Sequence, residues 1–401
     1  MPERAGCCKV TTCVAGRRDA YAARVTASMS PSVPGPAPAP VPPLPAGLDT
    51  PALVVFLERV LANVDRLQGE LSARGVSLRP HVKTHKSVRI ARIQLDAGAQ
   101  GLTVGTLGEA EVMASAGLHD LFLAYPIWAE GPKAGRVRAL HDLADLRVGV
   151  ESVEGAQRLG AAVAGARRPL HVLVEIDSGL HRTGVASPEE AVSVARAAAA
   201  AGLVVDGVFT HGGHAYRPGA AGGVALDEVT ALEAGAGALE TAGFEVAIVS
   251  AGSTPTRTLS AGGRVTEIRA GTYALGDRQQ VALGAMGPED PAAVVAGTVV
   301  AVRAGRAVLD AGAKALTKDL PAFVSGYGAV PAWPGAIVEK LNDYHGMVSL
   351  AGGGVRPRLG DVVAVVPNHV CPVVDLVSSF DVVRPDGRVE HWAVDARGRS
   401  G

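Results

Sequence analysis

Cysteine is scarce in this sequence, and long apolar runs are absent. Four cysteines occur among 401 residues, and Cys7, Cys8 and Cys13 all lie close to the N-terminus. This distribution excludes a disulfide framework and favours a reducing cytoplasm. The longest apolar runs, such as Ala198–Gly202 and Val362–Val366, are far shorter than the roughly 18 residues that span a bilayer. We therefore expect no membrane segment.

An excess of one charge is also absent. The 38 basic and 39 acidic residues leave a formal net charge of -1. Nucleic-acid binding needs a basic surface, so that class of partner is not expected. The 48% hydrophobic residues can form the core of one large domain and a smaller one. The expected partners are small molecules and a second copy of the chain.

The N-terminal segment, residues 1–46, is predicted to be a disordered tail. Ser30–Pro45 consists almost wholly of Pro, Ala, Ser, Val and Gly, which favour extended conformations and cannot form a core. Four arginines precede it, but the apolar region of a secretory signal is missing. Met29 is an alternative start of the chain.

Residues 47–283 alternate β-branched runs with amphipathic stretches rich in Ala and Leu. This pattern predicts an α/β fold, a (β/α)8 barrel of parallel strands connected by helices. The predicted strands are Leu78–Val82, Gly101–Val104, Asp120–Ala124, Leu146–Val150, Leu170–Ile176, Val204–Thr210, Val246–Ser250 and Glu267–Arg269. The predicted helices are Leu57–Arg74, Leu107–Ala116, Val153–Ala164, Pro188–Ala201 and Leu226–Ala242.

Residues 284–401 differ in sequence pattern, with short runs of strand-forming residues separated by Gly and Pro. They predict a C-terminal, mostly antiparallel β-domain. Its strands are expected at Val294–Val302, Arg306–Leu309, Ile337–Asn342, His345–Ser349, Asp361–Pro367 and Phe380–Arg384. Ala52–Phe56 has no obvious partner in the barrel and is a candidate for the same sheet.

The segment Arg79–Lys86 (RPHVKTHK) concentrates titratable residues at the end of a predicted strand. In a strand, His81, Lys83 and His85 would share one face. A lysine crowded by imidazoles and partly desolvated has a lowered pKa, and a neutral amine can bond to an aldehyde. The alternative is a basic strand end in water.

Two turns of small residues predict a phosphate site. Ala251–Pro255 (AGSTP) follows a strand, and Thr254 and Pro255 are suited to start a helix whose free N–H groups would bind an anion. A second turn, Ala270–Tyr273, ends the next strand. The alternative for the first turn is an ordinary capped helix.

The sequence Asn368–Pro372 (NHVCP) contains a candidate metal pair. In an extended segment, His369 and Cys371 would point the same way, and imidazole with thiolate favours Zn²⁺ over Mg²⁺ or Ca²⁺. Two protein ligands leave positions for water and substrate, as catalytic sites require. The alternative is a buried cysteine beside an unrelated histidine.

These motifs together resemble the family of D-threonine aldolases and D-serine dehydratases, from about Leu48 to Asp381. The resemblance rests on four segments that occur in the same order as in the family: Leu48–Ala52, Arg79–Lys86, Gly252–Pro255 and Asn368–Pro372. The resemblance implies an alanine racemase-like barrel that binds pyridoxal 5′-phosphate, a C-terminal β-domain and a homodimer. It also implies a divalent metal, zinc or another such as Mn²⁺.

The resemblance also implies roles for individual residues. Lys83, and not Lys86, would bond covalently to the cofactor, with His211 and Tyr216 as further catalytic residues lining the pocket. Arg182, in the segment Glu175–Gly184, would lie under the cofactor ring. The remaining expected contacts to the cofactor, most of them to its phosphate, come from His81, Tyr216, Gly252, Ser253, Thr254, Gly271 and Tyr273.

The metal pair favours one branch of the family. Its dehydratases resemble His-x-Cys and its aldolases His-x-Asp, so Cys371 indicates a lyase that converts D-serine to pyruvate and ammonia. A D-threonine aldolase, which releases glycine and acetaldehyde, is the main alternative. A racemase, which needs no metal, and a non-catalytic pyridoxal-phosphate carrier are further alternatives.

Overall fold

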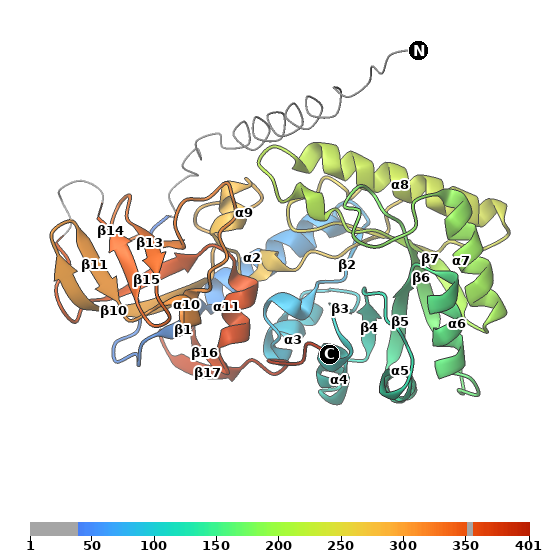
Figure 1. Ribbon diagram of the computed structural model, residues 1–401, viewed down its shortest axis with the longest axis horizontal. Coiled ribbons are helices and arrows are strands. Elements are labelled where there is room, and N and C mark those ends of the chain that lie inside the picture. The colour runs from blue at the N-terminus through green and yellow to red at the C-terminus, as the bar shows by residue number, and fades with distance from the viewer. Residues whose placement is uncertain (1–38, 351–355) are drawn as a thin grey trace, which may run out of the picture.

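The computed structural model describes residues 39–350 and 356–401, which form two β-sheets with helices around one of them (Figure 1). Most of the predicted tail, with Cys7, Cys8, Cys13 and Met29, lies outside the described residues. Within residues 39–46, Val41 and Leu44 pack against a small core that includes Val54 and Phe56, a contact that the prediction of disorder did not anticipate.

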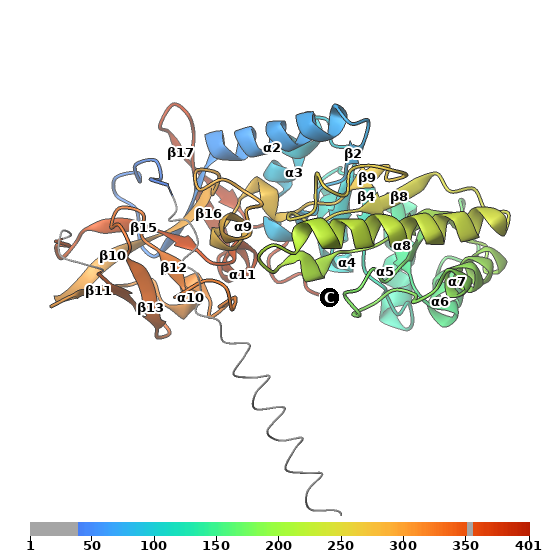
Figure 2. The same ribbon diagram turned by 90° about the horizontal axis from the view of Figure 1, so that it is seen from above.

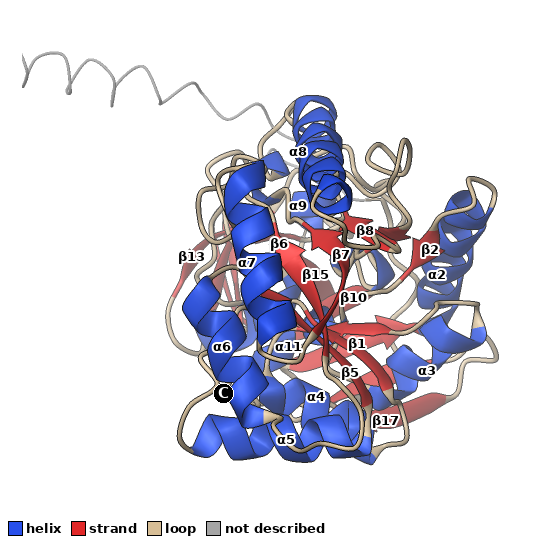
Figure 3. Cartoon of the chain, turned by 90° about the vertical axis from the view of Figure 1, so that its right-hand side faces the viewer, coloured by secondary structure: helices blue, strands red, loops and turns tan. Residues whose placement is uncertain are grey.

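The first sheet has eight parallel strands in the order β2-β9-β8-β7-β6-β5-β4-β3 and curls on itself (Figure 3). The predicted fold class is confirmed. Its strands are β2 (Ser77–Leu78), β3 (Leu102–Val104), β4 (Asp120–Leu123), β5 (Asp145–Val150), β6 (His171–Glu175), β7 (Val204–Phe209), β8 (Ile248–Ala251) and β9 (Glu267–Ile268).

Helices between the strands cover the outside of this sheet (Figures 1 and 3). Several begin at an N-cap residue whose side-chain hydroxyl accepts a hydrogen bond from the backbone N–H three residues later in the chain. Thr106 caps α4, Ser152 caps α6 and Ser187 caps α7 in this way. Two of these helices, α3 and α5, were not predicted from the sequence. The helices are α2 (Leu57–Ser72), α3 (Val88–Asp96), α4 (Leu107–Ser115), α5 (Pro132–Leu143), α6 (Val153–Ala162), α7 (Pro188–Ala200) and α8 (Ala221–Thr241).

The barrel closes where the segment after β2 meets β3. Backbone N–H groups of Gln100 and Thr103 donate to the carbonyls of Leu78 (2.9 Å) and Pro80 (2.8 Å). On the other side, Arg79 and His81 donate to the carbonyls of β9 and Ala270. Residues 78–81, which we call the closing segment, therefore join the two edges of the sheet.

Arg79 anchors the closing segment from inside the protein. Its side chain is 1% exposed, and its guanidinium donates to Glu267 (2.5 Å) and to Asp120 (2.5 Å). Gly101 leaves the room for it, because a Cβ there would lie 2.2 Å from Arg79 Nη1. The Glu267 side chain is itself only 4% exposed, so the ion pair is buried on both sides.

The second sheet has nine strands, mostly antiparallel, and includes the early strand β1 (Ala52–Phe56) between β10 and β16. Its other strands are β10 (Ala293–Arg303), β11 (Arg306–Leu309), β12 (Gly328–Ala329), β13 (Ile337–Leu341), β14 (Gly346–Ser349), β15 (Val362–Pro367), β16 (Ser379–Val383) and β17 (Val389–Ala393). The short helices are α9 (Arg278–Ala282), α10 (Ala313–Leu316) and α11 (Val370–Leu376). β12, β17 and these three helices were not predicted from the sequence.

The chain crosses between the two sheets more than once (Figures 1 and 2). β1 of the second sheet leads directly into α2 of the barrel. After β17 the chain returns to the barrel, where Ala396 N donates to the carbonyl of Lys86 and Gly108 N to that of Gly401. None of the helices in residues 39–350 and 356–401 combines the length and apolarity needed to cross a membrane.

The closing segment gives a first prediction. Arg79→Met leaves the Glu267 carboxylate buried without its cation and is expected to lower the free energy of unfolding by about 3–5 kcal/mol, measured by urea denaturation. Arg79→Met combined with Glu267→Met should recover most of this loss. Arg89→Met, which removes an exposed pair with Glu390, is the control and should cost less than about 1 kcal/mol. Equal losses for the buried and the exposed pair would contradict the prediction.

Candidate active site

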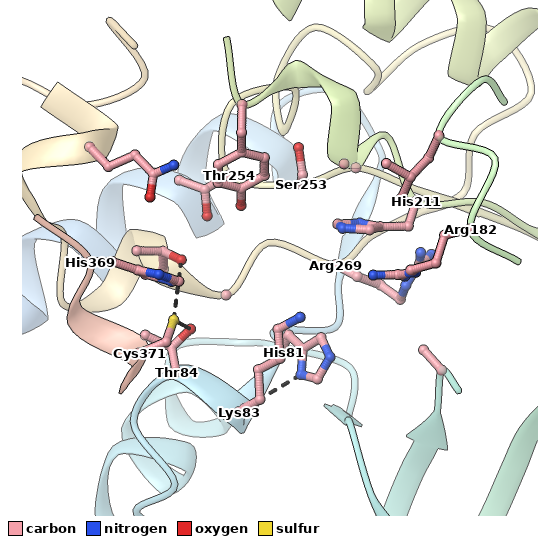
Figure 4. A pocket seen from close by; sticks show the side chains of 18 of the residues that line it. His81, Lys83, Thr84, Arg182, His211, Ser253, Thr254, Arg269, His369 and Cys371 are labelled. Carbon is pink, nitrogen blue, oxygen red and sulfur yellow. Dashed lines mark hydrogen bonds between the residues drawn. The ribbon is translucent and has the colours of Figure 1, made fainter. Parts of the chain in front are cut away.

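A cavity of about 470 Å³ lies where the carboxyl ends of the barrel strands meet loops of the second sheet. This volume is in the range of small-molecule sites, roughly 300–1,000 Å³. Of the residues predicted from sequence, all except Tyr273 line it: His81, Lys83, Arg182, His211, Tyr216, Gly252, Ser253, Thr254, Gly271, His369 and Cys371. Figure 4 shows His369 and Cys371 on one side of Lys83 and Arg182, His211 and Arg269 on the other.

Lys83 enters the cavity from a 3₁₀ turn, Val82–Thr84, and not from a strand as predicted. β2 ends at Leu78, because the closing segment and the turn replace regular strand pairing. Lys83 is exposed to the cavity, yet the protein atoms around it desolvate the amine and lower its pKa, and the charges of Arg182 and Arg269 lower it further. The lowered pKa favours a neutral amine.

The change from strand to turn separates the predicted histidines. His81 lines the cavity, and burial, followed by the charge of Lys83, lowers its pKa well below the ordinary value. Burial lowers the pKa of His211 in the same way. His85 does not line the cavity, because it is buried behind the turn and bonded to Gln94. The expected convergence of three groups is therefore corrected to His81 and Lys83.

The predicted phosphate loop lines the cavity but does not start a helix. Residues 254–259 form turns, in which Ser253 N donates to the Thr256 hydroxyl (3.0 Å) and Gly252 N to Glu228 (3.1 Å). Those two N–H groups are therefore not free for an anion. The Thr254 hydroxyl is instead buried without a hydrogen-bond partner at the cavity wall. A donor without an acceptor at this place fits a bound anion.

Tyr273 does not reach the cavity. Its side chain is buried and its hydroxyl accepts a hydrogen bond from Gln94 (3.0 Å). Thr272, one position earlier, lines the cavity beside Gly271. A Cβ at Gly271 would lie 3.0 Å from the carbonyl of His81, so the absence of a side chain lets this turn pack against the closing segment.

His369 and Cys371 come together at the start of helix α11, where His369 is the N-cap, and not in the extended segment that was predicted. Cys371 Sγ lies 3.2 Å from the hydroxyl of Thr84. Burial raises the pKa of the Cys371 thiol, but the hydrogen bond with His369, the charge of His369 and the hydrogen bond with Thr84 outweigh this effect and leave the pKa lowered. A thiolate beside an imidazole is a donor set suited to zinc.

The His369 ring is fixed on its other side by Asp319, which the sequence analysis missed. Nδ1 of His369 lies 2.5 Å from the Asp319 carboxylate. Burial alone would lower the pKa of His369, but the hydrogen bonds with Cys371 and Asp319 and the charge of Asp277 raise it to about 10. No motif marks Asp319, because it lies in an irregular loop 50 positions before the histidine.

The far end of the cavity is cationic. Arg269 is 5% exposed, lies over the rings of Phe122 and Phe209, and donates to Ser250 (2.5 Å) and to the carbonyl of Thr210. Sequence reasoning missed it, because no motif of the sequence marks Arg269. Glu175 was also missed; burial raises the pKa of its carboxyl, and its Oε2 has no hydrogen-bond partner.

Sequence comparisons place the chain among known proteins. Residues 55–279 match the alanine racemase N-terminal domain, and residues 292–383 match a putative serine dehydratase domain. The chain is 35% identical to D-threo-3-hydroxyaspartate dehydratase of Delftia sp. (strain HT23), covering 86% of this chain and 97% of the relative. It is 32% identical to D-threonine aldolase of Arthrobacter sp, covering 88% and 94%.

Solved structures agree with these relatives. D-threonine aldolase from Filomicrobium marinum superposes with a TM-score of 0.82 at 30% identity, over 91% of this chain and all of that one. The Delftia dehydratase superposes with a TM-score of 0.78 at 33% identity, over 86% and 97%. A cysteine-to-alanine mutant of that dehydratase is described as metal-free.

His85 gives a prediction on pH dependence. Burial of the imidazole lowers its pKa from 6.5 to about 4, and the opposing effect of its hydrogen bonds with Gln94 and Ser87 N is smaller. The unfolded chain binds this proton below pH 6.5, so stability is full above pH 6.5 and falls as the pH drops towards 4, by up to about 3 kcal/mol.

The measurement is urea denaturation of wild type and His85→Gln at pH 7 and pH 4.5. The variant should lose markedly less stability on acidification than the wild type. His119→Gln, which removes an exposed histidine, serves as the control and should follow the wild type. Identical pH dependence in wild type and His85→Gln would contradict the assignment.

Proposed function

Because this chain belongs to the alanine racemase-like pyridoxal-phosphate enzymes that include D-threo-3-hydroxyaspartate dehydratase and D-threonine aldolase, we propose that it is a metal-dependent dehydratase of a β-hydroxy D-amino acid. D-Serine is the proposed substrate, and the products are pyruvate and ammonia. The observation that carries the proposal is that the His369 imidazole and the Cys371 thiol line the same cavity as the Lys83 amine.

The cavity residues fit pyridoxal 5′-phosphate. Lys83 supplies an amine whose lowered pKa suits covalent attachment to the cofactor's aldehyde. Thr254 supplies a buried hydroxyl without a partner for the phosphate, and Gly252, Ser253, Gly271 and Thr272 line the same wall. When bound, this cofactor stabilises negative charge at the substrate Cα.

His369 and Cys371 would hold the metal, with zinc preferred by their donor types. When bound, a divalent metal acts as a Lewis acid on a hydroxyl oxygen and makes it a better leaving group. The two residues lie on the opposite side of Lys83 from Arg182 and Arg269, so the β-carbon of the substrate would face His369 and Cys371.

Lys83 Nζ is the proposed base for the substrate α-proton, because its lowered pKa allows a neutral amine. Burial raises the pKa of Tyr216, so its hydroxyl stays protonated and can donate a proton or hydrogen bond in the cavity. The neutral His211 takes no positive charge there. Overall, the α-proton and the β-hydroxyl leave as water, and a second water releases ammonia to give the 2-oxo acid.

The D-threonine aldolase alternative is supported by relatives of similar identity. It would use the same cavity, with a base taking the proton of the β-hydroxyl and Cα–Cβ cleavage releasing glycine and an aldehyde. Cys371 favours the dehydratase, because dehydratases of this family resemble His-x-Cys and aldolases His-x-Asp. We also propose that the protein is a homodimer, as the resemblance implies, but the product assay below does not depend on this.

The substrate side chain is proposed to be uncharged. Beside His369 and Cys371 the cavity is lined by Thr272, Gln279 and the carboxylate of Asp319. Asp319 would repel a second carboxylate on the substrate. The Asp319 carboxylate therefore favours D-serine over 3-hydroxyaspartate, on which the Delftia relative acts according to its name.

A product assay tests the reaction. Protein loaded with pyridoxal 5′-phosphate and Zn²⁺ is expected to form pyruvate from D-serine, to stop on chelation, and to lose at least about 100-fold of its activity in Lys83→Ala. Glycine and acetaldehyde from D-threonine, without 2-oxo acid from either substrate, would show an aldolase. Racemisation that persists in Cys371→Ala would show a racemase. Cofactor absorbance without any turnover would show a non-catalytic pyridoxal-phosphate carrier.

Substrate preference is a separate prediction. The value of kcat/KM for D-serine is expected to exceed that for D-threo-3-hydroxyaspartate by at least about 10-fold, the equivalent of one unfavourable charge contact of about 1.4 kcal/mol. Both are measured by the same 2-oxo acid assay in one buffer. A higher value for the dicarboxylic substrate would contradict the role given to Asp319 in selectivity while leaving the dehydratase proposal intact.

A further inference from the structure

We propose that Asp319 is the positioning residue of the metal site: it fixes the His369 ring so that Nε2 is the nitrogen that faces Cys371 and binds the metal. The inference rests on the proposed function and adds to it a residue outside the His-x-Cys motif. It concerns how one ligand is held and does not depend on which substrate the enzyme prefers.

The contact itself determines which nitrogen carries a proton. Nδ1 of His369 lies 2.5 Å from Oδ2 of Asp319. An ionised carboxylate only accepts hydrogen bonds, so the proton of the ring is on Nδ1. In the neutral ring the lone pair is then on Nε2, and this nitrogen is the one available to a metal.

The second contact of the ring identifies where that nitrogen lies. His369 is also hydrogen bonded to Cys371. Since Nδ1 is occupied by Asp319, Nε2 is the atom on the Cys371 side, and Figure 4 shows both side chains at the same end of the cavity. The ring nitrogen opposite Asp319 and the Cys371 sulfur are therefore the two atoms that would bind a metal ion.

Asp319 is held in place by the segment that carries the ligands. Asn368, the residue before His369, donates from Nδ2 to the carbonyl of Asp319 (3.2 Å) and to that of Gly326 (2.8 Å). Arg278 donates to Oδ1 of Asn368 (3.1 Å) and to the carbonyl of Ser325 (2.5 Å). Thus the loop with the carboxylate and the start of α11 are fixed to each other.

Asp319 acts through His369 and not as a third ligand. Across the two described stretches of the chain, no three His, Cys, Asp or Glu side chains are grouped closely enough to hold one ion. A carboxylate bonded to the non-ligating nitrogen of a histidine fixes the ring and raises its strength as a ligand. Loss of such a partner typically costs about 10–100-fold in metal affinity.

The test measures Zn²⁺ affinity of the cofactor-loaded protein by competition with a chromophoric chelator, without substrate. Asp319→Ala is expected to weaken Zn²⁺ binding by about 10–100-fold, and Asp319→Asn, which keeps the shape and an acceptor oxygen, by less. Leu320→Ala, next along the same loop with an exposed side chain, is the matched control and should bind as the wild type does. Co²⁺ absorbance bands that report thiolate bonding should persist in Asp319→Asn.

The supporting result is loss of affinity in the Asp319 variants with cofactor absorbance and thermal midpoint close to those of Leu320→Ala. Equal affinity in wild type and Asp319→Ala would overturn the assignment alone. An equal loss in Leu320→Ala would overturn it as well, because the effect would then belong to the loop. Failure of the wild-type protein to bind Zn²⁺ or Co²⁺ would overturn the metal-dependent function together with this inference.

Discussion

The closure of the barrel at residues 78–81 is the constraint on which the rest of the site depends. These residues give their backbone groups to β3 on one side and to β9 and the following turn on the other, so the main chain cannot shift without opening the sheet. The buried Arg79 and Glu267 fix the same segment through their side chains. Lys83 lies in the 3₁₀ turn that directly follows these residues, so its amine has a defined position in the cavity.

The second sheet completes the cavity from the opposite side. It supplies His369 and Cys371 at the start of α11 and the loop with Asp319, while Thr84 of the barrel contacts the Cys371 sulfur. Neither part of the chain alone contains both the amine and the metal pair. The connections through β1 and through the C-terminal return to Lys86 and Gly108 keep the two parts together.

Charge is distributed unevenly across this cavity, and the distribution suits the proposed chemistry. Arg182 and Arg269 lie on one side of Lys83 and lower its pKa, whereas Cys371 and His369, whose ring contacts Asp319, lie on the other. Burial keeps His81 and His211 neutral and Tyr216 protonated. Anionic groups of the substrate can therefore be directed to the arginine side of the cavity and metal-binding groups to the opposite side.

The sequence by itself determined the fold class, most strand positions and nearly all the residues that line the cavity, because hydrophobic periodicity and local motifs follow from contacts between near neighbours. It did not determine how the motifs are held: Lys83 lies on a turn, Thr254 does not cap a helix, and His369 precedes a helix. The Tyr273 side chain is bonded to Gln94 and does not line the cavity. Arg269, Glu175 and Asp319 line the cavity although no sequence motif marks them. Only the tertiary structure decides such placements, since they depend on barrel closure and on contacts between residues far apart in the chain, such as the 50 positions between Asp319 and His369.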